Sequence, residues 1–397
     1  MRPEGASKRR KRNPALSTPS PLHVATAGLN AWIEVDLDRL AANLTALRRA
    51  IGPAVEIIAI VKGNAYGHGA IPVARALVEL GVERLAVAYM PEAMALREAG
   101  IDAPLLVLEH SFASDAGAAI AHDIAVTVHS RALAGALSNA AAAAATRARV
   151  HIKVDTGLRR FGVLPDEAVE LAEYCRGLPG VEVEGLFTHM ANADEPDDSF
   201  ADTQRARFEE MLTRLDWIPY RHAANSATAL RRGELRFHGV RIGLALHGIP
   251  PPNTPDPGLR PTLRLKARVA RVLHVEPGEG VAYGLTWRAG RPSTLALVPV
   301  GYADGWRRSL GNRGEVLVAG ERCPLVGRVM MDQFLVDITT APAEVQEGDE
   351  VVLIGEQGAE AISAGEIATL EDTISWEVLA ALTARLPRLY VRGDLVF

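Results

Sequence analysis

The feature that most constrains the fold is an alternation of short apolar runs with longer stretches of helical spacing, which extends from Trp32 to Ile249. The runs that we expect to form strands are Glu56–Val61, Leu85–Tyr89, Pro104–Glu109, Ile124–Val128, Val150–Val154, Val183–Thr188, Arg221–Asn225 and Val240–Gly243. Such alternation is typical of parallel strands joined by crossover helices. Because a closed (β/α)8 (TIM) barrel takes about 200–250 residues, the number of units favours that α/β fold over a doubly wound sheet.

The pattern of the sequence changes after Ile249. A proline-rich stretch from Pro250 to Pro261 predicts a linker, and short strand-like runs dominate from there on. We expect one strand over Arg264–Val275 and one helix over Ile374–Ala384. The predicted organisation is therefore a tail (residues 1–30), a barrel domain (31–250) and a mainly β C-terminal domain (262–397). The segment Ala31–Leu37 is also strand-like, and it is a candidate member of the second sheet.

Composition narrows the class of protein. The net charge of −5 argues against a dedicated nucleic-acid binder, and no apolar run approaches the roughly 20 residues that span a bilayer. The cysteines, Cys175 and Cys323, are too few for a disulfide framework, which fits a cytoplasmic protein. A basic run, Lys8–Arg12, precedes a Pro/Ser-rich stretch without the apolar segment of a secretory signal. We expect this tail to be solvated rather than a tether to nucleic acid or membrane, and its role stays open.

The strongest local feature is the segment Ala59–Gly69. Lys62 follows an apolar strand directly, which would put its amine at the carboxyl end of the barrel, where active sites of such barrels lie. A lysine that is partly desolvated there has a lowered pKa and a nucleophilic amine. Tyr66 and the glycines around it offer a hydroxyl and tight turns. On these residues alone, a surface lysine at a strand end is an equally good interpretation.

Further motifs extend over both predicted domains. In chain order with Ala59–Gly69 they are His151–Gly162, Gly185–Asp194, His222–Ser226, Val240–Gly243, Ala282–Gly284, Gly301–Trp306, Gly327–Gln333 and Arg385–Tyr390. Together they resemble the alanine racemases, barrel-fold enzymes that use pyridoxal 5′-phosphate (PLP). The resemblance covers Trp32 to Tyr390. It implies a PLP-dependent isomerase that interconverts L- and D-alanine and supplies D-alanine.

The resemblance implies two acid/base groups. Lys62 would hold PLP covalently and exchange a proton on one face of the substrate, and Tyr283 would do so on the other face. Inversion of a stereocentre through a planar carbanion needs proton exchange on both faces. In the family the tyrosine comes from the partner subunit, so the resemblance also implies a homodimer with shared active sites.

The resemblance also implies a set of cofactor-binding residues: Lys62, Tyr66, His189, Asn225, Ser226, Arg241, Gly243 and Trp376. Arg241 would face the pyridine nitrogen, with His189 orienting it, although an isolated arginine of this kind is more often part of a structural ion pair. Asn225 and Ser226 alone would more often form a helix cap. Trp376 stands where the family usually has a tyrosine that reaches the phosphate, and His247 also replaces a tyrosine.

Substrate binding follows from the same resemblance. Arg160 and the backbone amide of Met331 would hold the substrate carboxylate, and Tyr302 and Asp332 would line the pocket. Lys153 matches a position that is often carbamylated in the family, and the alternative is an unmodified lysine paired with Asp155.

Other functions remain to be weighed. A racemase of broader specificity, or one acting on serine, differs by very little in the pocket. A non-catalytic PLP-binding protein would lack the second domain that carries Tyr283. A barrel-fold decarboxylase would place a carboxylate, not Arg241, toward the pyridine nitrogen. No metal site is predicted.

Overall fold

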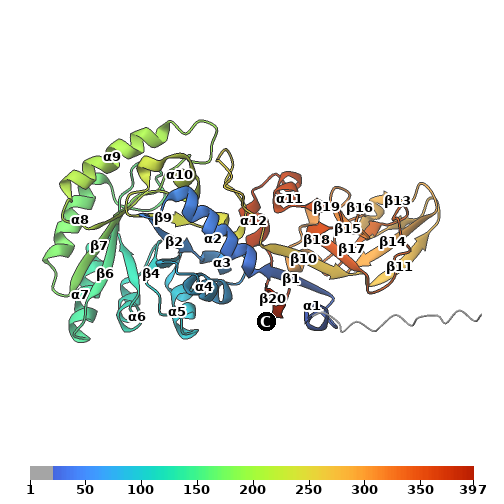
Figure 1. Ribbon diagram of the computed structural model, residues 1–397, viewed down its shortest axis with the longest axis horizontal. Helices are drawn as coiled ribbons and strands as arrows, with labels where there is room; N and C mark the ends of the chain where they lie inside the picture. Colours follow the sequence, from blue (N-terminus) through green and yellow to red (C-terminus); the bar gives the residue numbers. More distant parts are fainter. Residues whose placement is uncertain (1–20) are drawn as a thin grey trace, which may run out of the picture.

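The predicted barrel forms one half of the computed structural model, which describes residues 21–397 (Figure 1). Its parallel strands close in chain order: β2 (Glu56–Ile60), β3 (Arg84–Val87), β4 (Leu105–Val107), β5 (Ala125–Val128), β6 (Ala148–Lys153), β7 (Val181–Phe187), β8 (Tyr220–His222) and β9 (Gly239–Ile242). The helices of this half are α2 (Leu37–Ile51), α3 (Lys62–Tyr66), α4 (Ala70–Glu79), α5 (Met90–Glu98), α6 (Ala116–Ala121), α7 (Arg131–Ala143), α8 (Pro165–Gly177), α9 (Phe200–Arg214) and α10 (Ser226–Arg231). The fold prediction is confirmed. The basic run Lys8–Arg12 lies outside the described residues.

The apolar alternation within a strand explains why the sheet closes. In β2, Ile58 and Ile60 pack with Phe187 in a separate cluster, whereas Ile57 and Ala59 belong to the large cluster that includes helix residues. Because successive side chains of a strand point to opposite faces, one face of β2 fills the barrel and the other packs against the helices. Both faces are therefore buried, as the near-continuous apolar runs of the sequence require.

The second half is built around an eleven-stranded sheet. Its strands are β1 (Ala31–Asp36), β10 (Leu263–Arg268), β11 (Arg271–Val275), β14 (Ser293–Val298), β15 (Glu315–Val318), β16 (Glu321–Val326), β17 (Phe334–Asp337), β18 (Glu350–Gln357), β19 (Glu360–Ile362), β20 (Arg388–Arg392) and β21 (Leu395–Val396). A small hairpin of β12 (Gly280–Val281) and β13 (Trp287–Arg288) forms a second sheet. The mainly β character of this half is as predicted.

The strand β1 joins the beginning of the chain to the second domain. It pairs with β10 in antiparallel and with β20 in parallel orientation, so the segment Ala31–Asp36 belongs to the second sheet although the barrel follows it directly. The strands β1, β10 and β20 lie where the two halves meet (Figure 1). The end of the chain is thereby brought beside the start of the barrel.

Two predicted elements of the second domain differ from the structure. The single strand expected over Arg264–Val275 is two strands, because the chain changes partner between them: β10 pairs with β18, and β11 pairs with β14. The single helix expected over Ile374–Ala384 ends at Ala380, and a further helix precedes it. These helices are α11 (Ala364–Glu371), which has Ser363 as its N-cap, and α12 (Ser375–Ala380). A glycine inside α11 weakens the helical signal.

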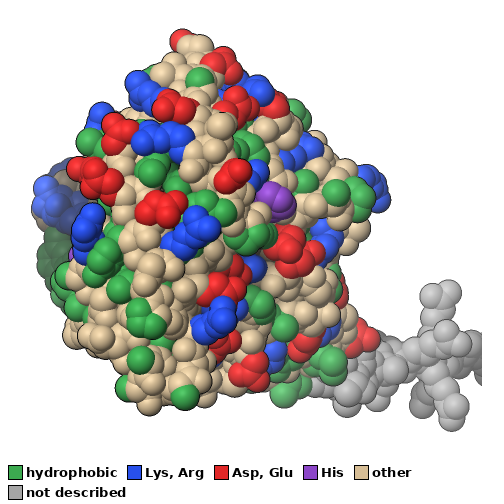
Figure 2. Space-filling model, turned by 90° about the vertical axis from the view of Figure 1, so that its left-hand side faces the viewer, with side chains coloured by type: hydrophobic (Ala, Val, Ile, Leu, Met, Phe, Trp, Pro, Cys, Tyr) green, Lys and Arg blue, Asp and Glu red, His purple; other side chains and the backbone are tan. Residues whose placement is uncertain are grey.

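The outer end of the barrel carries mixed charge. Over the face formed by α7, α8 and α9, basic and acidic side chains lie next to one another (Figure 2). Pairs such as Arg205 with Glu209 and Arg214 with Asp166 join them at 2.8 and 2.7 Å. Surface pairs of this kind stabilise a fold only slightly. The groups that bear on chemistry lie at the opposite, inner side of the molecule.

Candidate active site

A cavity of about 490 Å³ opens at the carboxyl ends of the barrel strands. It gathers ten of the residues that the sequence singles out: Lys62, Tyr66, Lys153, Arg160, His189, Asn225, Ser226, Arg241, Gly243 and Trp376. All but Trp376 come from the barrel, and Trp376 comes from α12 of the second domain. The site therefore lies where barrel enzymes place their chemistry, and it is closed on one side by the C-terminal domain.

A left-handed turn positions Lys62. The four residues Gly63 to Tyr66 all have φ between 51° and 61°. For residues other than glycine this conformation costs about 1–3 kcal/mol each, so neighbouring groups must hold the turn. The carboxylate of Glu92 does so by accepting hydrogen bonds from the backbone N–H of Gly63 (2.7 Å) and of Ala88 (2.8 Å).

The environment of Lys62 makes its ammonium group easier to deprotonate. Burial lowers the pKa of Lys62, and the positive charge of Arg160 lowers it further, while the carboxylate of Glu109 opposes both. The neutral form is the nucleophile, and a lysine that exchanges protons near neutral pH needs a lowered pKa. Lys62 thus has the properties required of a covalent anchor and a base.

Arg241 is held from several sides in the barrel interior. Its Nη2 atom donates to the carbonyl oxygens of Thr188 and Ala223, both at 2.7 Å, and lies 3.1 Å from Nδ1 of His189. Its Nη1 atom donates to Nδ1 of His222 at 2.8 Å. Burial lowers the pKa of Arg241 to about 9, which still leaves the guanidinium charged at neutral pH. The cavity therefore contains a fixed cation that cannot act as a proton acceptor.

A chain of hydrogen bonds extends from Arg241 through the barrel. Nε2 of His222 lies 3.0 Å from Nδ1 of His151, and Nε2 of His151 lies 3.2 Å from Oε2 of Glu184. Arg84 pairs with the other oxygen of Glu184 at 2.8 Å. Burial lowers the pKa of both histidines, so each is neutral and carries one N–H. Because Glu184 can only accept, each histidine is protonated on Nε2, and Nδ1 of His222 is left to accept from Arg241.

A small polar cradle lies at the ends of β8 and β9. The backbone N–H of Gly243 donates to Oγ of Ser226 at 3.1 Å, and Asn225 caps α10 by accepting from Thr228. A Cβ atom at Gly243 would lie 2.3 Å from the Tyr66 hydroxyl, so only glycine allows this approach. Two hydroxyls that converge beside backbone amides at the late strands suit a phosphate group. The residues present fit the phosphate end of PLP. Lys62 fits the carbon to which a lysine is covalently attached, and Arg241 fits the pyridine nitrogen.

The partner of Lys153 differs from the one expected. Asp155 accepts from the backbone of Gly157 and Arg159, whereas Nζ of Lys153 lies 3.2 Å from Oε2 of Glu109. Glu109 lines the cavity and follows β4. Glu109 was not among the expected site residues, although a carboxylate at the end of the predicted strand Pro104–Glu109 was a usable signal.

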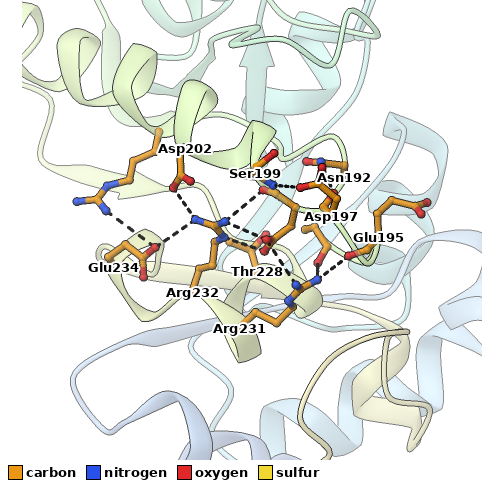
Figure 3. Close-up of polar contacts among 12 residues, drawn as sticks. Asn192, Glu195, Asp197, Ser199, Asp202, Thr228, Arg231, Arg232 and Glu234 are labelled. Atoms are coloured by element: carbon orange, nitrogen blue, oxygen red, sulfur yellow. Dashed lines mark hydrogen bonds and ion pairs between the residues drawn. The ribbon is translucent and has the colours of Figure 1, made fainter.

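The loop that follows β7 closes another side of the cavity, to which it contributes Asp194 and Glu195. Arg231 donates to the carbonyl oxygen of Glu195 at 2.7 Å (Figure 3). Arg232 pairs with Asp198 at 2.8 Å. The linker also contributes to the cavity wall, with Pro251, Pro252 and Asn253. From the sequence, this linker was predicted only as a domain boundary.

His247 lies behind the cavity wall rather than in it. Its ring stacks on His68 with centroids 3.8 Å apart and meets the ring of Tyr66 edge-on at 6.2 Å. Burial lowers the pKa of His247, so it is neutral. The substitution of tyrosine by histidine therefore affects the support of Tyr66 and not the cavity surface.

Four of the predicted site residues do not line the cavity: Tyr283, Tyr302, Met331 and Asp332. All lie in the second domain and are exposed, Tyr283 to 71%. Arg385 fixes this surface by pairing with Asp304 at 3.2 Å and with Asp332 at 2.8 Å. Within one chain, the structure leaves these residues outside the site that holds Lys62.

Comparisons with known proteins agree with this geometry. The family model for the alanine racemase N-terminal domain matches residues 35–251, and that for the C-terminal domain matches residues 262–390. The chain belongs to the alanine racemase family. The members of this family are isomerases, and the enzyme class expected from the sequence is confirmed.

Individual alanine racemases are similar over most of their length. The alanine racemase of Halothermothrix orenii is 43% identical over 368 residues, which covers 90% of this chain and 96% of that protein. The alanine racemase of Symbiobacterium thermophilum is 44% identical over 365 residues, with the same coverage of 90% and 96%. The crystal structure of alanine racemase from Bacillus anthracis with bound L-Ala-P has a TM-score of 0.86 at 40% identity and covers 92% of this chain and 96% of that one.

Two further observations concern membrane-spanning helices and metal-binding groups. Over residues 21–397, no helix combines the length and apolar character needed to cross a membrane. Within the same residues, histidine, cysteine, aspartate and glutamate side chains form no group of three or more that could hold a metal ion.

Proposed function

We propose that this chain interconverts L- and D-alanine with PLP attached to Lys62. The observation that carries the proposal is the convergence of Lys62 and Arg241 in one cavity. One is a lysine whose pKa burial lowers, and the other is a buried cation held by a chain of neutral histidines. The names of the relatives supply the reaction and the substrate.

Different residues around the cavity would hold different parts of the cofactor. Tyr66, Ser226 and the amide of Gly243 would bind the phosphate, with Asn225 shaping the turn and Trp376 covering it. Arg241, oriented by His189, would donate to the pyridine nitrogen. When bound, PLP draws electrons from the α-carbon and makes the α-proton acidic. Because a guanidinium has no proton to give up at neutral pH, Arg241 leaves the ring nitrogen unprotonated, which limits side reactions.

Proton exchange would use one group on each face of the substrate. The neutral amine of Lys62 removes or returns a proton on one face. On the other face, the phenol of Tyr283 of the partner subunit would do the same in a homodimer. Two features support a shared site: Tyr283 is 71% exposed, and it is not among the residues that line the cavity of its own chain.

The substrate carboxylate would lie between the subunits. The guanidinium of Arg160 offers it a bidentate contact, and the backbone amide of Met331 of the partner subunit a second one. Tyr302 of the partner subunit and Asp332 of the partner subunit would form the remaining wall. Arg385 supports this arrangement because it fixes Asp332 within its own chain.

We also propose a cytoplasmic location. Both cysteines, Cys175 and Cys323, are buried and unpaired, as in proteins of a reducing compartment.

The test is a chiral analysis of products. The purified protein, supplied with PLP, is incubated separately with L-alanine and L-serine, and Lys62→Ala serves as control. We expect D-alanine from L-alanine, a smaller yield of D-serine, and neither product from the control. A higher kcat/KM for serine would assign the protein to a racemase of different specificity, and the absence of both products would contradict the proposal.

A further inference from the structure

The loop that follows β7 is tied down at successive carbonyl oxygens where it borders the cavity. Nη1 of Arg231 donates to the carbonyl oxygen of Glu195 at 2.7 Å (Figure 3). The same atom donates to the carbonyl oxygen of Ala193 at 3.2 Å. The carbonyl between them belongs to Asp194 and accepts from Nδ2 of Asn253, in the linker, at 2.8 Å. These three consecutive loop residues, the wall segment, are therefore held from two sides, and two of them line the cavity.

The arginine that holds the wall segment stands at the end of α10, and the phosphate cradle lies at the beginning of the same helix. Ser226 is the first residue of α10 and Arg231 is the last. Six residues with a rise of 1.5 Å each place the two ends only about 8 Å apart. Asn225 caps the helix by accepting from the backbone N–H of Thr228 at 2.9 Å and from its hydroxyl at 3.0 Å. The backbone N–H of Arg232 closes the other end by donating to the carbonyl oxygen of Thr228 at 2.8 Å. One short, capped helix thus connects the cradle to the wall segment.

The start of the loop is held independently of Arg231. The side chain of Gln204, on α9, is completely buried. Its Oε1 atom accepts from the backbone N–H of Ala191 at 2.8 Å, and its Nε2 atom donates to the carbonyl oxygen of His189 at 3.0 Å. Loss of the Arg231 contacts should therefore loosen the wall segment and leave His189, with Arg241 beside it, in place.

Resting on the function proposed above, we propose that Arg231 is a positioning residue for the wall of the substrate cavity, and that α10 couples this wall to the filling of the phosphate cradle. A phosphate bound by Ser226 and the amide of Gly243 would restrain the first turn of α10. Because Arg231 belongs to the same short helix, its guanidinium is then restrained as well, and the wall segment with it. The Arg231 side chain is only 20% exposed, and its Nη2 atom lies 3.4 Å from Oδ1 of Asp198, which fixes its direction. The wall against which the amino acid lies is therefore held best when the cradle is filled.

The first test measures amide hydrogen exchange by mass spectrometry, in the apoenzyme and after addition of PLP. In the wild type, PLP should slow exchange in peptides that cover residues 193–198 as well as in peptides that cover the cradle. Arg231→Met keeps an unbranched apolar stem and lacks the donors. In this variant PLP should still slow exchange at the cradle, but no longer at residues 193–198. Equal protection of residues 193–198 in both proteins would overturn the coupling.

The second test separates substrate binding from chemistry. Arg231→Met should raise KM for alanine about fivefold or more and leave kcat within about twofold, because the wall is loosened and Lys62 is not touched. Coupling between two binding events is reciprocal and typically amounts to a factor of about 5–150, so the Kd for PLP should rise as well. The matched control is Arg205→Met on α9, which removes surface ion pairs with Glu209 and Glu234 and should match the wild type. A KM and a Kd that both stay within twofold of wild type would overturn the role of Arg231.

Arg231→Lys keeps the experiment decisive should Arg231→Met fail to fold. An ammonium group retains the positive charge but does not reproduce the planar fork that contacts both carbonyls and Asp198. Arg231→Lys should therefore lose part of the protection at residues 193–198 and raise KM by a smaller factor, whereas wild-type values would contradict the proposal.

The two proposals fail in different ways. A wild type that binds PLP but is inactive toward both amino acids would count against the proposed function, whereas the exchange measurement would still decide whether the wall segment responds to the cradle. A wild type that binds no PLP would contradict both proposals.

Discussion

The Nε atom of Arg388 donates a hydrogen bond of 2.7 Å to the carbonyl oxygen of Gly67, in the turn that follows Lys62. The same guanidinium binds the carbonyl oxygens of Thr383 and Leu382, so one side chain joins the end of the chain to the turn that follows Lys62. Tyr390 adds a second link by donating to the carbonyl oxygen of His68 at 3.1 Å. The second domain therefore supports the strained turn that holds Lys62.

This link predicts the effect of Arg388→Ala. Several buried carbonyl groups would lose a charged donor, which should lower the free energy of unfolding by about 2–3 kcal/mol. We also expect weaker retention of PLP, because the turn with Lys62 would loosen. Urea denaturation and PLP titration measure the two effects. Arg388→Lys is the informative control: a single ammonium cannot reach all these acceptors, so a variant with wild-type stability would contradict the account.

A local pattern predicted only part of the site. Lys62 could be placed because the apolar run of β2 fixes where that strand ends, whereas His189 and Arg241 were expected only from the resemblance to the alanine racemases. Glu109 could not be recognised as a site residue, because its contacts are with Lys153, at the end of β6, and with Arg160, in the loop that follows β6. The chain of hydrogen bonds from Arg241 through His222 and His151 could not be predicted either, because these residues lie on different strands.

The second domain was harder to predict in detail. Its strands change partners within the sheet, as between β10 and β11, and such a change leaves no mark on the apolar alternation. The membership of β1 in this sheet was only a candidate, since a strand does not encode which sheet it joins. Tyr283, Tyr302 and Met331 lie away from the cavity, so one chain alone does not explain them.

The covalent role of Lys62 has a direct test. Reduction of the holoenzyme with borohydride should fix the cofactor to the peptide that contains Lys62, because burial lowers the pKa of this lysine. Lys62→Ala should lose racemisation, since the attachment and one base disappear together. Peptide mass spectrometry identifies the labelled residue, and a label on another lysine, such as Lys153, would refute the assignment.

Substitutions of Trp376 test how the phosphate end of the cavity binds PLP. If the indole does not replace a phenol, PLP binding lacks a neutral hydrogen bond worth about 0.5–1.5 kcal/mol. Trp376→Tyr should then tighten PLP binding severalfold, as measured by equilibrium titration of the apoenzyme. Trp376→Phe, which offers an aromatic ring without a polar group, should not tighten binding. If both variants bind PLP more weakly than the wild type, Trp376 already serves the phosphate or the packing.

Glu184 predicts a pH-dependent stability. Burial alone would raise the pKa of Glu184, but the hydrogen bonds from His151 and Arg84 and the charge of Arg84 outweigh it and lower the pKa from 4.5 to about 2. A carboxyl pKa that is lower in the folded state stabilises the fold above pH 4.5, and the contribution is lost as the pH falls toward 2. After allowance for solvent screening it is on the order of 2 kcal/mol at pH 7.

Glu184→Gln removes this charge and keeps the shape. Its unfolding free energy should be lower than that of the wild type at pH 7, and the difference should shrink by about two-fifths at pH 3.5. Urea denaturation at several pH values measures it. A difference independent of pH would mean that the chain from Arg241 ends in a neutral group.

The shared site can be tested by mixing two inactive variants. Lys62→Ala and Tyr283→Ala should each be nearly inactive as homodimers, because each removes one of the two proton-exchanging groups from both sites. In a heterodimer of the two variants, one site receives both defects, and the other combines an intact Lys62 with an intact Tyr283 of the partner subunit. A two-fold symmetric dimer with sites built across its interface therefore predicts activity up to roughly half that of a wild-type dimer. Mass measurements on differently tagged subunits verify the exchange. If exchange is complete and the mixture stays inactive, Lys62 and Tyr283 of one chain serve the same site, and the exposed position of Tyr283 needs another explanation.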